Sequence, residues 1–328
     1  MTGKIAAVSM VRNECDIIEL FITINLRQLD HIFIIDHNSD DSTPEIVRRM
    51  AEGDDRITML SNSSPEFRQS DLITRQVREI ARSGNFDYII PLDADEFLAV
   101  DDGESSLLTI LQQHLPLSGV GAMPWRTYCP TSDDYFEQDT PLFSIFRMRK
   151  SEPEQYYKIV LGREFAKNCI VYEGNHAAKS KGRHSKPVAL PLTLQHVPVR
   201  SSSQIIRKAI LGSHSLSIKQ GRTVGEGFHW DEIANYIRSK SFSISSEDLR
   251  FIGATYAASM DQYTEIDLMN DGPNIGISTD NIAIKDLSKI DLIVSFDKYI
   301  ANISNLLNNE REELNIFSKI IRKIFGIS

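Results

Sequence analysis

The length and composition of the chain are those of a globular protein. Its 328 residues are 41% hydrophobic and 25% charged, and the net charge of -9 argues against nonspecific nucleic-acid binding, which requires a basic surface. Cys15, Cys129 and Cys169 are widely spaced and predict neither a disulfide framework nor a zinc site. The N-terminus lacks a signal-peptide pattern, and no stretch reaches the roughly 18 apolar residues that span a bilayer, so we expect a cytoplasmic protein.

The first hundred residues alternate strand and helix patterns. Short apolar segments at residues 5–10, 32–36, 56–60 and 86–92 predict strands. Helical periodicity between them predicts helices at residues 15–27, 44–51 and 71–82. This alternation is typical of an α/β fold with a mainly parallel central sheet covered on both faces. Ligands of such sheets bind beyond the carboxyl ends of the strands.

Two carboxylates follow the fourth predicted strand directly, in the run Asp93-Ala94-Asp95-Glu96-Phe97. Because buried unpaired carboxylates are costly, this pair requires a cation or strong hydrogen-bond donors. Mg²⁺ and Mn²⁺ prefer oxygen ligands and commonly also hold substrate phosphates. The pattern therefore predicts a metal–phosphate site at Asp93 and Asp95. An Asp-rich loop that caps a helix is the alternative interpretation.

A second polar motif follows the second predicted strand. Asp36 ends that strand, where its carboxylate could accept hydrogen bonds from a base N–H or a ribose hydroxyl. Ser42 and Glu45 have the spacing of a capping box, with Pro44 in the first helical turn. Helix capping explains the second half of the motif but not Asp36, for which we expect ligand contact.

After residue 119 the strand patterns become shorter, at residues 120–124, 143–148, 157–161, 170–172 and 190–194. They predict a mixed or antiparallel extension that closes over the site. Helical patterns follow at residues 203–219, 231–238 and 247–260. We expect a catalytic domain at residues 1–220 and a helical C-terminal region at residues 221–328.

Four side chains of this extension are candidate site residues, each with a structural alternative. Trp125 could stack on a sugar face or belong to the core. Lys158 could bind a diphosphate or be a solvated strand residue. His176 and His196 lie near strand ends, and either could complete a metal shell because imidazole is an acceptable Mn²⁺ ligand, or serve only structure.

Three motifs follow one another in a recognisable order. They are Val11-Arg12-Asn13-Glu14 at a helix start, Asp36-His37-Asn38-Ser39-Asp40-Asp41-Ser42-Thr43, and Leu92-Asp93-Ala94-Asp95-Glu96-Phe97-Leu98. With these motifs the chain resembles the family-2-type glycosyltransferases of the GT-A fold, in the branch related to family 92. The resemblance covers residues 4–100 well and continues more loosely to about residue 208.

The resemblance implies roles for residues of the nucleotide site. Arg12, Asn13 and Glu14 would lie near the base, Asp36 would contact the uracil or ribose, and Arg75 would face the nucleotide. In the Asp-x-Asp pair, Asp95 would be the more direct ligand of Mn²⁺ or Mg²⁺ and Asp93 would lie nearer the ribose.

The implied reaction is metal-dependent transfer of a sugar from a nucleotide diphosphate sugar, most simply a UDP-sugar, to a saccharide or lipid-linked saccharide. Inversion at the transferred carbon and a place in bacterial lipopolysaccharide or capsule synthesis are further implications. The Glu-Asp pair that supplies the base in family 2 has no match after residue 100, which leaves the base open. The candidates are Glu96, Asp133, Asp134, Glu173 and His176, of which Glu96 is also a candidate for substrate contact.

Other classes of function remain possible at this stage. A phosphoryl transferase of the haloacid-dehalogenase type also uses two aspartates after a strand, but on its first strand. A nucleotidyltransferase is closer in fold, but residues 9–14 contain no glycine for a phosphate-binding opening. A non-catalytic sugar-nucleotide-binding scaffold is the third alternative, and the intact aspartate pair argues against it.

The C-terminal residues 314–328 have the pattern of a basic amphipathic helix. Apolar residues fall at helical spacing on one face and cations on the other. Such a helix could lie at the inner face of the cell membrane, which would suit a lipid-linked acceptor, or dock on the domain or on a second subunit. The sequence leaves both readings and the oligomeric state open.

Overall fold

A mixed β-sheet forms the centre of the protein. The computed structural model describes residues 3–62, 69–99, 106–131, 146–148, 156–217, 225, 227–257 and 269. The strand order of the sheet is β3-β2-β1-β4-β8-β6-β13-β5, with β7 and β12 paired to β6. The bounds of these strands are β1 (Ile5–Val11), β2 (His31–His37), β3 (Ile57–Asn62), β4 (Tyr88–Pro91), β5 (Glu96–Ala99), β6 (Val120–Pro130), β7 (Phe146–Met148), β8 (Tyr157–Gly162), β12 (Val188–Ala189) and β13 (Thr193–His196).

The first four strands run parallel and the later ones make the sheet mixed. β1 pairs in parallel with both β2 and β4, and β2 with β3. β8 is antiparallel to β4 and β6, and β13 is parallel to β6 but antiparallel to β5. The predicted α/β fold with a parallel first half and a mixed extension is therefore confirmed.

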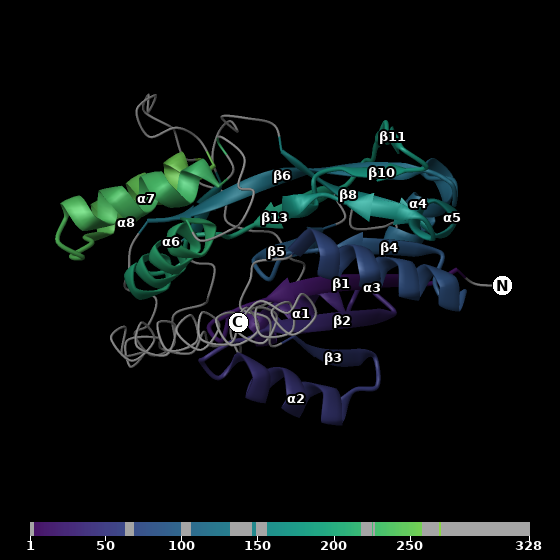
Figure 1. The fold of residues 1–328 in the computed structure, drawn as a ribbon, viewed down its shortest axis with the longest axis horizontal. Coiled ribbons are helices and arrows are strands. Elements are labelled where there is room, and N and C mark those ends of the chain that lie inside the picture. The colour runs from purple at the N-terminus through teal and green to yellow at the C-terminus, as the bar shows by residue number, and fades with distance from the viewer. Residues whose placement is uncertain are drawn as a thin grey trace, which may run out of the picture. The chain divides into compact units, whose positions relative to one another are not determined.

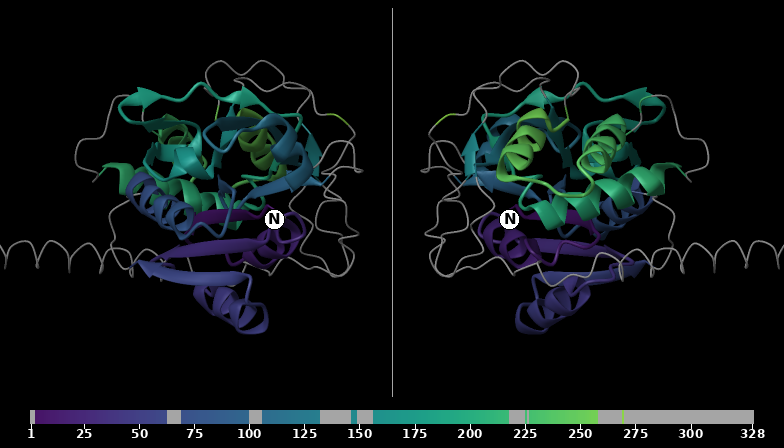
Figure 2. Two further views of the ribbon diagram at one scale, coloured as in Figure 1. Left: turned by 90° about the vertical axis from the view of Figure 1, so that its right-hand side faces the viewer. Right: turned by 90° about the vertical axis from the view of Figure 1, so that its left-hand side faces the viewer.

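Helices cover the sheet and gather beyond one end of it. α3 packs on β1 and β4, α2 packs beside β2 and β3, and α1 contacts α2 and β5. Figures 1 and 2 show α2 beside β3 at one edge, whereas α6, α7 and α8 lie together near the far end of β6. The bounds are α1 (Ile18–Asn25), α2 (Thr43–Gly53), α3 (Gln69–Ser83), α4 (Leu107–His114), α5 (Arg163–Ala166), α6 (Ser202–Ser217), α7 (Phe228–Ser239) and α8 (Ser246–Thr255).

A small antiparallel sheet lies beside α3. Its strands are β9 (Cys169–Val171), β10 (Ala178–Ser180) and β11 (Arg183–His184). The 3-10 turn η2 (Glu173–Asn175) connects β9 and β10, and it contacts α3 as β9 does. The core between α3 and the main sheet is aliphatic, with Val8, Ile73, Val77 and Ile89 all fully buried.

The strand order explains where a ligand site should form. β1 lies between β2 and β4 in the sheet, although β2 and β3 separate β1 from β4 in sequence. The chain therefore runs from β1 to β2 and β3 on one side of β1 and then crosses to β4 on its other side. A crevice opens at the carboxyl ends of the strands at such a switch point. Residues 12–14 follow β1 there, and residues 92–95 follow β4.

Several local expectations require correction. The capping box at Ser42 and Glu45 is wrong, because Ser42 has φ -80° and ψ 11° rather than an extended conformation and makes no side-chain cap hydrogen bond. The backbone N–H of Thr43 donates instead to Asp41 Oδ1 at 2.9 Å. The helix expected from residue 15 begins at Ile18, and β5 immediately after the aspartate pair was not anticipated.

The described residues all belong to one compact unit, Met1–Leu287. Residues Ser288–Ser328 form a second unit, and the helix predicted at residues 314–328 lies there, outside the described residues. The predicted division near residue 220 stays a prediction. Among the helices of the described part, none has the length and apolarity to cross a membrane.

Candidate functional site

A cavity of about 520 Å³ lies at the switch point of the sheet. Arg12, Asn13 and Glu14 after β1 line it together with Asp93 and Asp95 after β4. Residues of α6, the start of α7 and the segment after α8 complete the wall. The structure therefore brings residues 12–14 and the aspartate pair together, whereas Asp36 of the second polar motif is not part of the cavity wall.

Asp93 is held by three donors from three elements. Its carboxylate accepts hydrogen bonds from Gln69 Nε2 at 3.1 Å, from Asn175 Nδ2 at 3.2 Å, and from the ammonium group of Lys158. Its side chain remains 31% exposed, whereas Lys158 is fully buried. The Asp93 backbone N–H donates to Glu96 Oε2 at 2.8 Å. Asp93 is thus fixed in position while it still faces the cavity.

Asp95 is surrounded by cations instead. Lys208 Nζ of α6 donates to its Oδ2 at 2.8 Å, Arg200 Nη1 lies 3.9 Å from the same oxygen, and His196 Nε2 lies 3.7 Å from Oδ1. Burial by itself would raise the pKa of Asp95, but the positive charges of Lys208, His196 and Arg200 outweigh it and hold the pKa below its ordinary value. Asp95 is therefore ionised at neutral pH.

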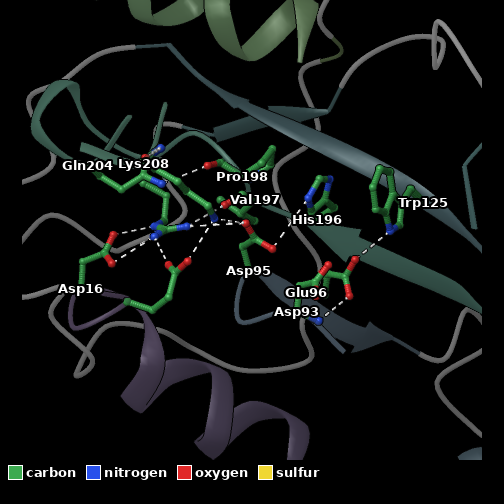
Figure 3. A network of polar contacts seen from close by, with 12 residues as sticks. Asp16, Asp93, Asp95, Glu96, Trp125, His196, Val197, Pro198, Gln204 and Lys208 are labelled. Atoms are coloured by element: carbon green, nitrogen blue, oxygen red, sulfur yellow. Dashed lines mark hydrogen bonds and ion pairs between the residues drawn. The ribbon is translucent and has the colours of Figure 1, made fainter. Parts of the chain in front are cut away.

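In the network of polar contacts that contains Asp16 and Asp95 (Figure 3), Arg200 joins the two loops that carry the site. It is fully buried, and it donates to Asp16 at 2.5 and 3.0 Å and to Glu14 Oε2 at 2.5 Å. Lys208 also pairs with Glu14, at 3.0 Å. The loop after β1 and the loop after β4 are in this way attached to the same two basic residues.

Aromatic rings form a second feature of the site. Trp125 Nε1 donates to Glu96 Oε1 at 2.9 Å, and the indole stacks on His196 with ring centroids 4.2 Å apart. His176 meets the edge of Trp125 at 5.1 Å. Since His176 Nδ1 lies 2.8 Å from the carbonyl oxygen of Tyr157, which can only accept, Nδ1 carries the proton and Nε2 is the unprotonated nitrogen of the neutral ring.

The described residues contain no group of three or more His, Cys, Asp or Glu side chains already arranged around a metal position. The charge of the ionic network nevertheless suits a divalent cation. Its five carboxylates outnumber its three cations. Burial, against the charge of Lys158, raises the pKa of Glu96 to about 8, so Glu96 is largely uncharged at pH 7 and one negative charge is left over when the others are ionised. The carboxylates are Glu14, Asp16, Asp93, Asp95 and Glu96, and the cations are Lys158, Arg200 and Lys208. Two aspartates that line the cavity and a neighbouring imidazole fit Mg²⁺ or Mn²⁺ chemically.

The structure changes the interpretation of three candidates near the aspartate pair. Glu96 is fully buried and does not line the cavity, because it bonds Trp125 and Lys158 inside β5 and β8. Lys158 is equally buried and donates to Gly174 O at 2.7 Å, so it supports Asp93 instead of facing a diphosphate. His196 lies between Trp125 and Asp95 and does not line the cavity.

Two candidates from the nucleotide motif also lie outside the cavity wall. Asp36 is buried beside the cavity residue His37, and its Oδ1 has no hydrogen-bond partner in the structure. Burial raises the pKa of Asp36, against the hydrogen bonds of Ser39. Arg75 is exposed and lines a separate depression on the outside of α3 with Arg78, so its expected contact with the nucleotide is not supported.

The remaining candidates lie in the cavity or outside the described residues. Trp125, Glu173 and His176 line the wall, with Trp125 only 6% exposed. Asp133 and Asp134 fall in an undescribed segment.

Sequence reasoning missed the basic residues of the loop and helix after β13. Arg200, Lys208 and Arg207, which pairs with Asp40 and Asp41, were given no role. The signal that could have found them is the i, i+4 pair Gln204 and Lys208 on one face of α6, since both line the cavity.

Residues 7–152 match the model of a known family, described as glycosyl transferase family 2. The match spans fewer than half of the residues of the chain. The match confirms the resemblance to family 2 for these residues, so this part of the chain has the sequence pattern of a glycosyltransferase domain. It does not distinguish the branch related to family 92. The search among curated proteins found no match.

Solved structures with low sequence identity are similar in arrangement. A structure of GalNAc-T7 with UDP, GalNAc and Mn²⁺ is 13% identical, with 74% of this chain and 57% of that chain covered and a TM-score of 0.36. S. aureus TarS 1-349 is 10% identical, with coverages of 80% and 94% and a TM-score of 0.34. The mannosyltransferase PcManGT from Pyrobaculum calidifontis with GDP-Man and Mn²⁺ is 16% identical, with coverages of 66% and 64% and a TM-score of 0.32. This chain thus spans less than two thirds of the length of the first and third of these chains.

Proposed function

We propose that this protein is a metal-dependent glycosyltransferase that moves a sugar from a nucleotide diphosphate sugar, in the first instance a UDP-sugar, to a saccharide or lipid-linked saccharide. The observation that carries the proposal is the position of Asp93 and Asp95. They follow a buried strand at the switch point of the sheet and line a cavity in a region that matches glycosyl transferase family 2.

The acidic residues of the rim have distinct roles in this proposal. Asp93 and Asp95 hold a Mn²⁺ or Mg²⁺ ion, with His176 Nε2 as a third ligand on the same wall. When bound, the ion neutralises the diphosphate and so stabilises the charge of the departing nucleotide. Asp93 needs no reorganisation for this, because Gln69, Asn175 and Lys158 already fix it.

The nucleotide itself is held by the residues at the ends of β1 and β2. Arg12, Asn13 and Glu14 line the cavity where the base would lie. Asp36 adjoins the cavity residue His37, and its Oδ1 is a buried acceptor without a hydrogen-bond partner among the described residues; such a group is stabilised by a donor. A ribose hydroxyl or a base N–H supplies that donor.

The acceptor hydroxyl requires a base. Glu173 and His176 are the described candidates that line the cavity. Because His176 Nε2 is the proposed metal ligand, we assign the base to Glu173, which lies in the same turn as Asn175, the residue that bonds Asp93. Glu173 would take the proton of the acceptor hydroxyl, and the acceptor oxygen would attack the sugar carbon opposite the departing nucleotide, which would invert that carbon.

Finer assignments follow from the same proposal. We place the protein in the branch related to family 92 and in bacterial lipopolysaccharide or capsule synthesis. A lipid-linked acceptor would suit this role, and it would also suit a peripheral membrane contact through residues 314–328. Liposome flotation of the full chain and of a chain without residues 314–328 tests the membrane contact.

The test of the proposal is release of UDP from UDP-sugars with and without Mn²⁺. The wild-type protein should hydrolyse or transfer at least one UDP-sugar only when Mn²⁺ is present, and Asp95→Asn should lose that turnover. Asp87→Asn is the matched control, because Asp87 precedes the opposite end of the same strand and its carboxylate pairs with Arg163 at 2.8 Å, away from the cavity wall. Equal turnover by the Asp95→Asn and Asp87→Asn variants would exclude the proposed site.

A further inference from the structure

The cavity wall formed by the C-terminal helices is aromatic, whereas the rim around Asp93 and Asp95 is ionic. Phe228, His229, Trp230 and Tyr256, which together we call the aromatic wall, all line the cavity. Lys208 links the two regions, since its Nζ lies 2.8 Å from Asp95 Oδ2 and 6.0 Å from the centroid of the Trp230 ring. A ligand on the aromatic wall would therefore lie next to the rim.

The rings of the aromatic wall support one another in a fixed arrangement. His229 packs on Trp230 at 4.6 Å and on Tyr256 at 5.5 Å, and Trp230 meets Tyr256 nearly edge-on at 5.9 Å. A side chain at Gly212 of α6 would come within 3.3 Å of the Trp230 indole, so the glycine lets the indole lie against the helix. Tyr256 also contacts His196 at 5.5 Å, which ties the wall to the rings around Trp125.

The aromatic wall carries no charge at neutral pH. Burial lowers the pKa of His229 to about 4, and the positive charge of Lys208 and a smaller effect of His176 act in the same direction. The negative charge of Asp231 raises the pKa but does not compensate for them. Asp231 itself is bonded to Ser213 Oγ at 2.7 Å. His229 is thus a neutral ring with hydrogen-bonding nitrogens that packs on the rings of Trp230 and Tyr256.

This combination of features selects one class of ligand. A pyranose has an apolar C–H face that packs on aromatic rings and a polar edge that needs neutral hydrogen-bonding groups. An isoprenoid chain would be matched by aliphatic side chains, and a phosphate by cations, yet three of the four rings of the wall, those of His229, Trp230 and Tyr256, carry polar groups. We propose that the aromatic wall is the acceptor subsite and binds an uncharged pyranose ring beside the diphosphate position. The inference rests on the proposed function for its link to transfer.

The composition of the chain allows a direct test. It contains two tryptophans, Trp125 and Trp230, and both line the cavity, one at the rim and one in the aromatic wall. Trp125→Phe leaves only the reporter of the aromatic wall, and Trp230→Phe leaves only the reporter of the rim. Fluorescence of each variant therefore reports on one half of the cavity without background from elsewhere.

The experiment is a titration of the full-length variants with the methyl pyranosides of glucose, galactose and mannose, and with farnesyl monophosphate as a lipid probe. We expect a saturable change of Trp230 fluorescence in Trp125→Phe with at least one methyl pyranoside. Tyr256→Leu in that background should weaken the binding about tenfold, the size of a lost aromatic contact, and Tyr172→Leu, which lies outside the cavity wall, should not.

Saturation by farnesyl monophosphate alone, or by none of the probes, overturns the inference. If a variant does not fold, the wild-type chain labelled with 5-fluorotryptophan gives one fluorine resonance for each tryptophan, and the same titrations apply. UDP with Mn²⁺, titrated into Trp230→Phe, tests the rim separately. If methyl pyranosides bind but UDP with Mn²⁺ does not, the proposed function is rejected. If UDP with Mn²⁺ binds but no methyl pyranoside does, only the acceptor subsite is rejected.

Discussion

Replacement of Arg200 by leucine tests whether the ionic network holds the site together. The Arg200 side chain is fully buried and donates to Asp16 and Glu14, and Asp95 lies 3.9 Å away. The leucine would leave these carboxylates buried without their shared guanidinium. Removal of one partner from a buried ionic network costs about 3–5 kcal/mol, chiefly because the remaining charges are unpaired.

The measurement is the melting temperature by circular dichroism. At roughly 2 °C for each kcal/mol, the lower end of the range for large domains, the loss corresponds to about 6–10 °C. Arg163→Leu is the control, because Arg163 makes a half-exposed pair with Asp87 at 2.8 Å, and such pairs contribute about 1 kcal/mol or less. If Arg200→Leu lowered the melting temperature no more than Arg163→Leu does, the ionic network would not be responsible for holding the two loops together.

The pH dependence of this deficit has a defined sign. The cations hold the pKa of Asp95 below its ordinary value, so this group contributes stability that is present above its unfolded pKa of about 3.9 and is lost as the pH falls further. Arg200→Leu weakens that effect. The difference in melting temperature should therefore stay close to its full size from pH 7 to about pH 4 and shrink only below that, and a difference that grew on acidification would contradict the assignment.

Three further changes have outcomes that the structure fixes. Lys208→Met should strengthen binding of Mn²⁺ alone several-fold in calorimetry, because it removes a positive charge that pairs with Asp95 and Glu14; unchanged or weaker binding would be inconsistent with the charge balance. His229 has a pKa of about 4 in the folded state, whereas in the unfolded chain it takes up a proton below about pH 6.5. As the pH falls from about 6.5 to about 4, the free energy of unfolding therefore decreases by up to about 1.4 kcal/mol per pH unit. His229→Gln should remove that loss, seen as a smaller drop in melting temperature from pH 7 to pH 5, and an identical drop would refute it. Ser245→Ala should cost about 1 kcal/mol because Ser245 caps α8 in a complete capping box, whereas Ser42→Ala should cost clearly less at α2; equal losses in chemical denaturation would mean that the cap assignments are wrong.

The sequence was sufficient to locate the aspartate pair because the pattern is local. A short apolar strand followed by Asp93 and Asp95 can be recognised without knowledge of the rest of the fold. The parallel order of β1, β2, β3 and β4 follows similarly from alternating strand and helix patterns. Together they place residues 12–14 and 93–95 at one edge.

The partners of the aspartate pair could not be predicted, because they are distant in the chain. Lys208 is separated from Asp95 by 113 positions and Arg200 from Asp16 by 184. Their contacts depend on how α6 packs back against the first half of the sheet, and no local pattern encodes that. The position of Glu96 has a more local cause. β5 was not anticipated, and this strand directs Glu96 to buried Trp125 and Lys158 and away from the cavity wall, where substrate contact was expected.

The most direct test of the central claim is calorimetry of UDP binding with Mn²⁺ and in chelator. The claim is that Asp93 and Asp95 bind a divalent ion that in turn binds a diphosphate. The wild-type protein should bind UDP with Mn²⁺ at least tenfold more tightly than in chelator, a difference of about 1.4 kcal/mol, and Asp95→Asn should lose that difference while Asp87→Asn keeps it. Equal UDP affinity in both conditions for the wild-type protein would contradict the claim.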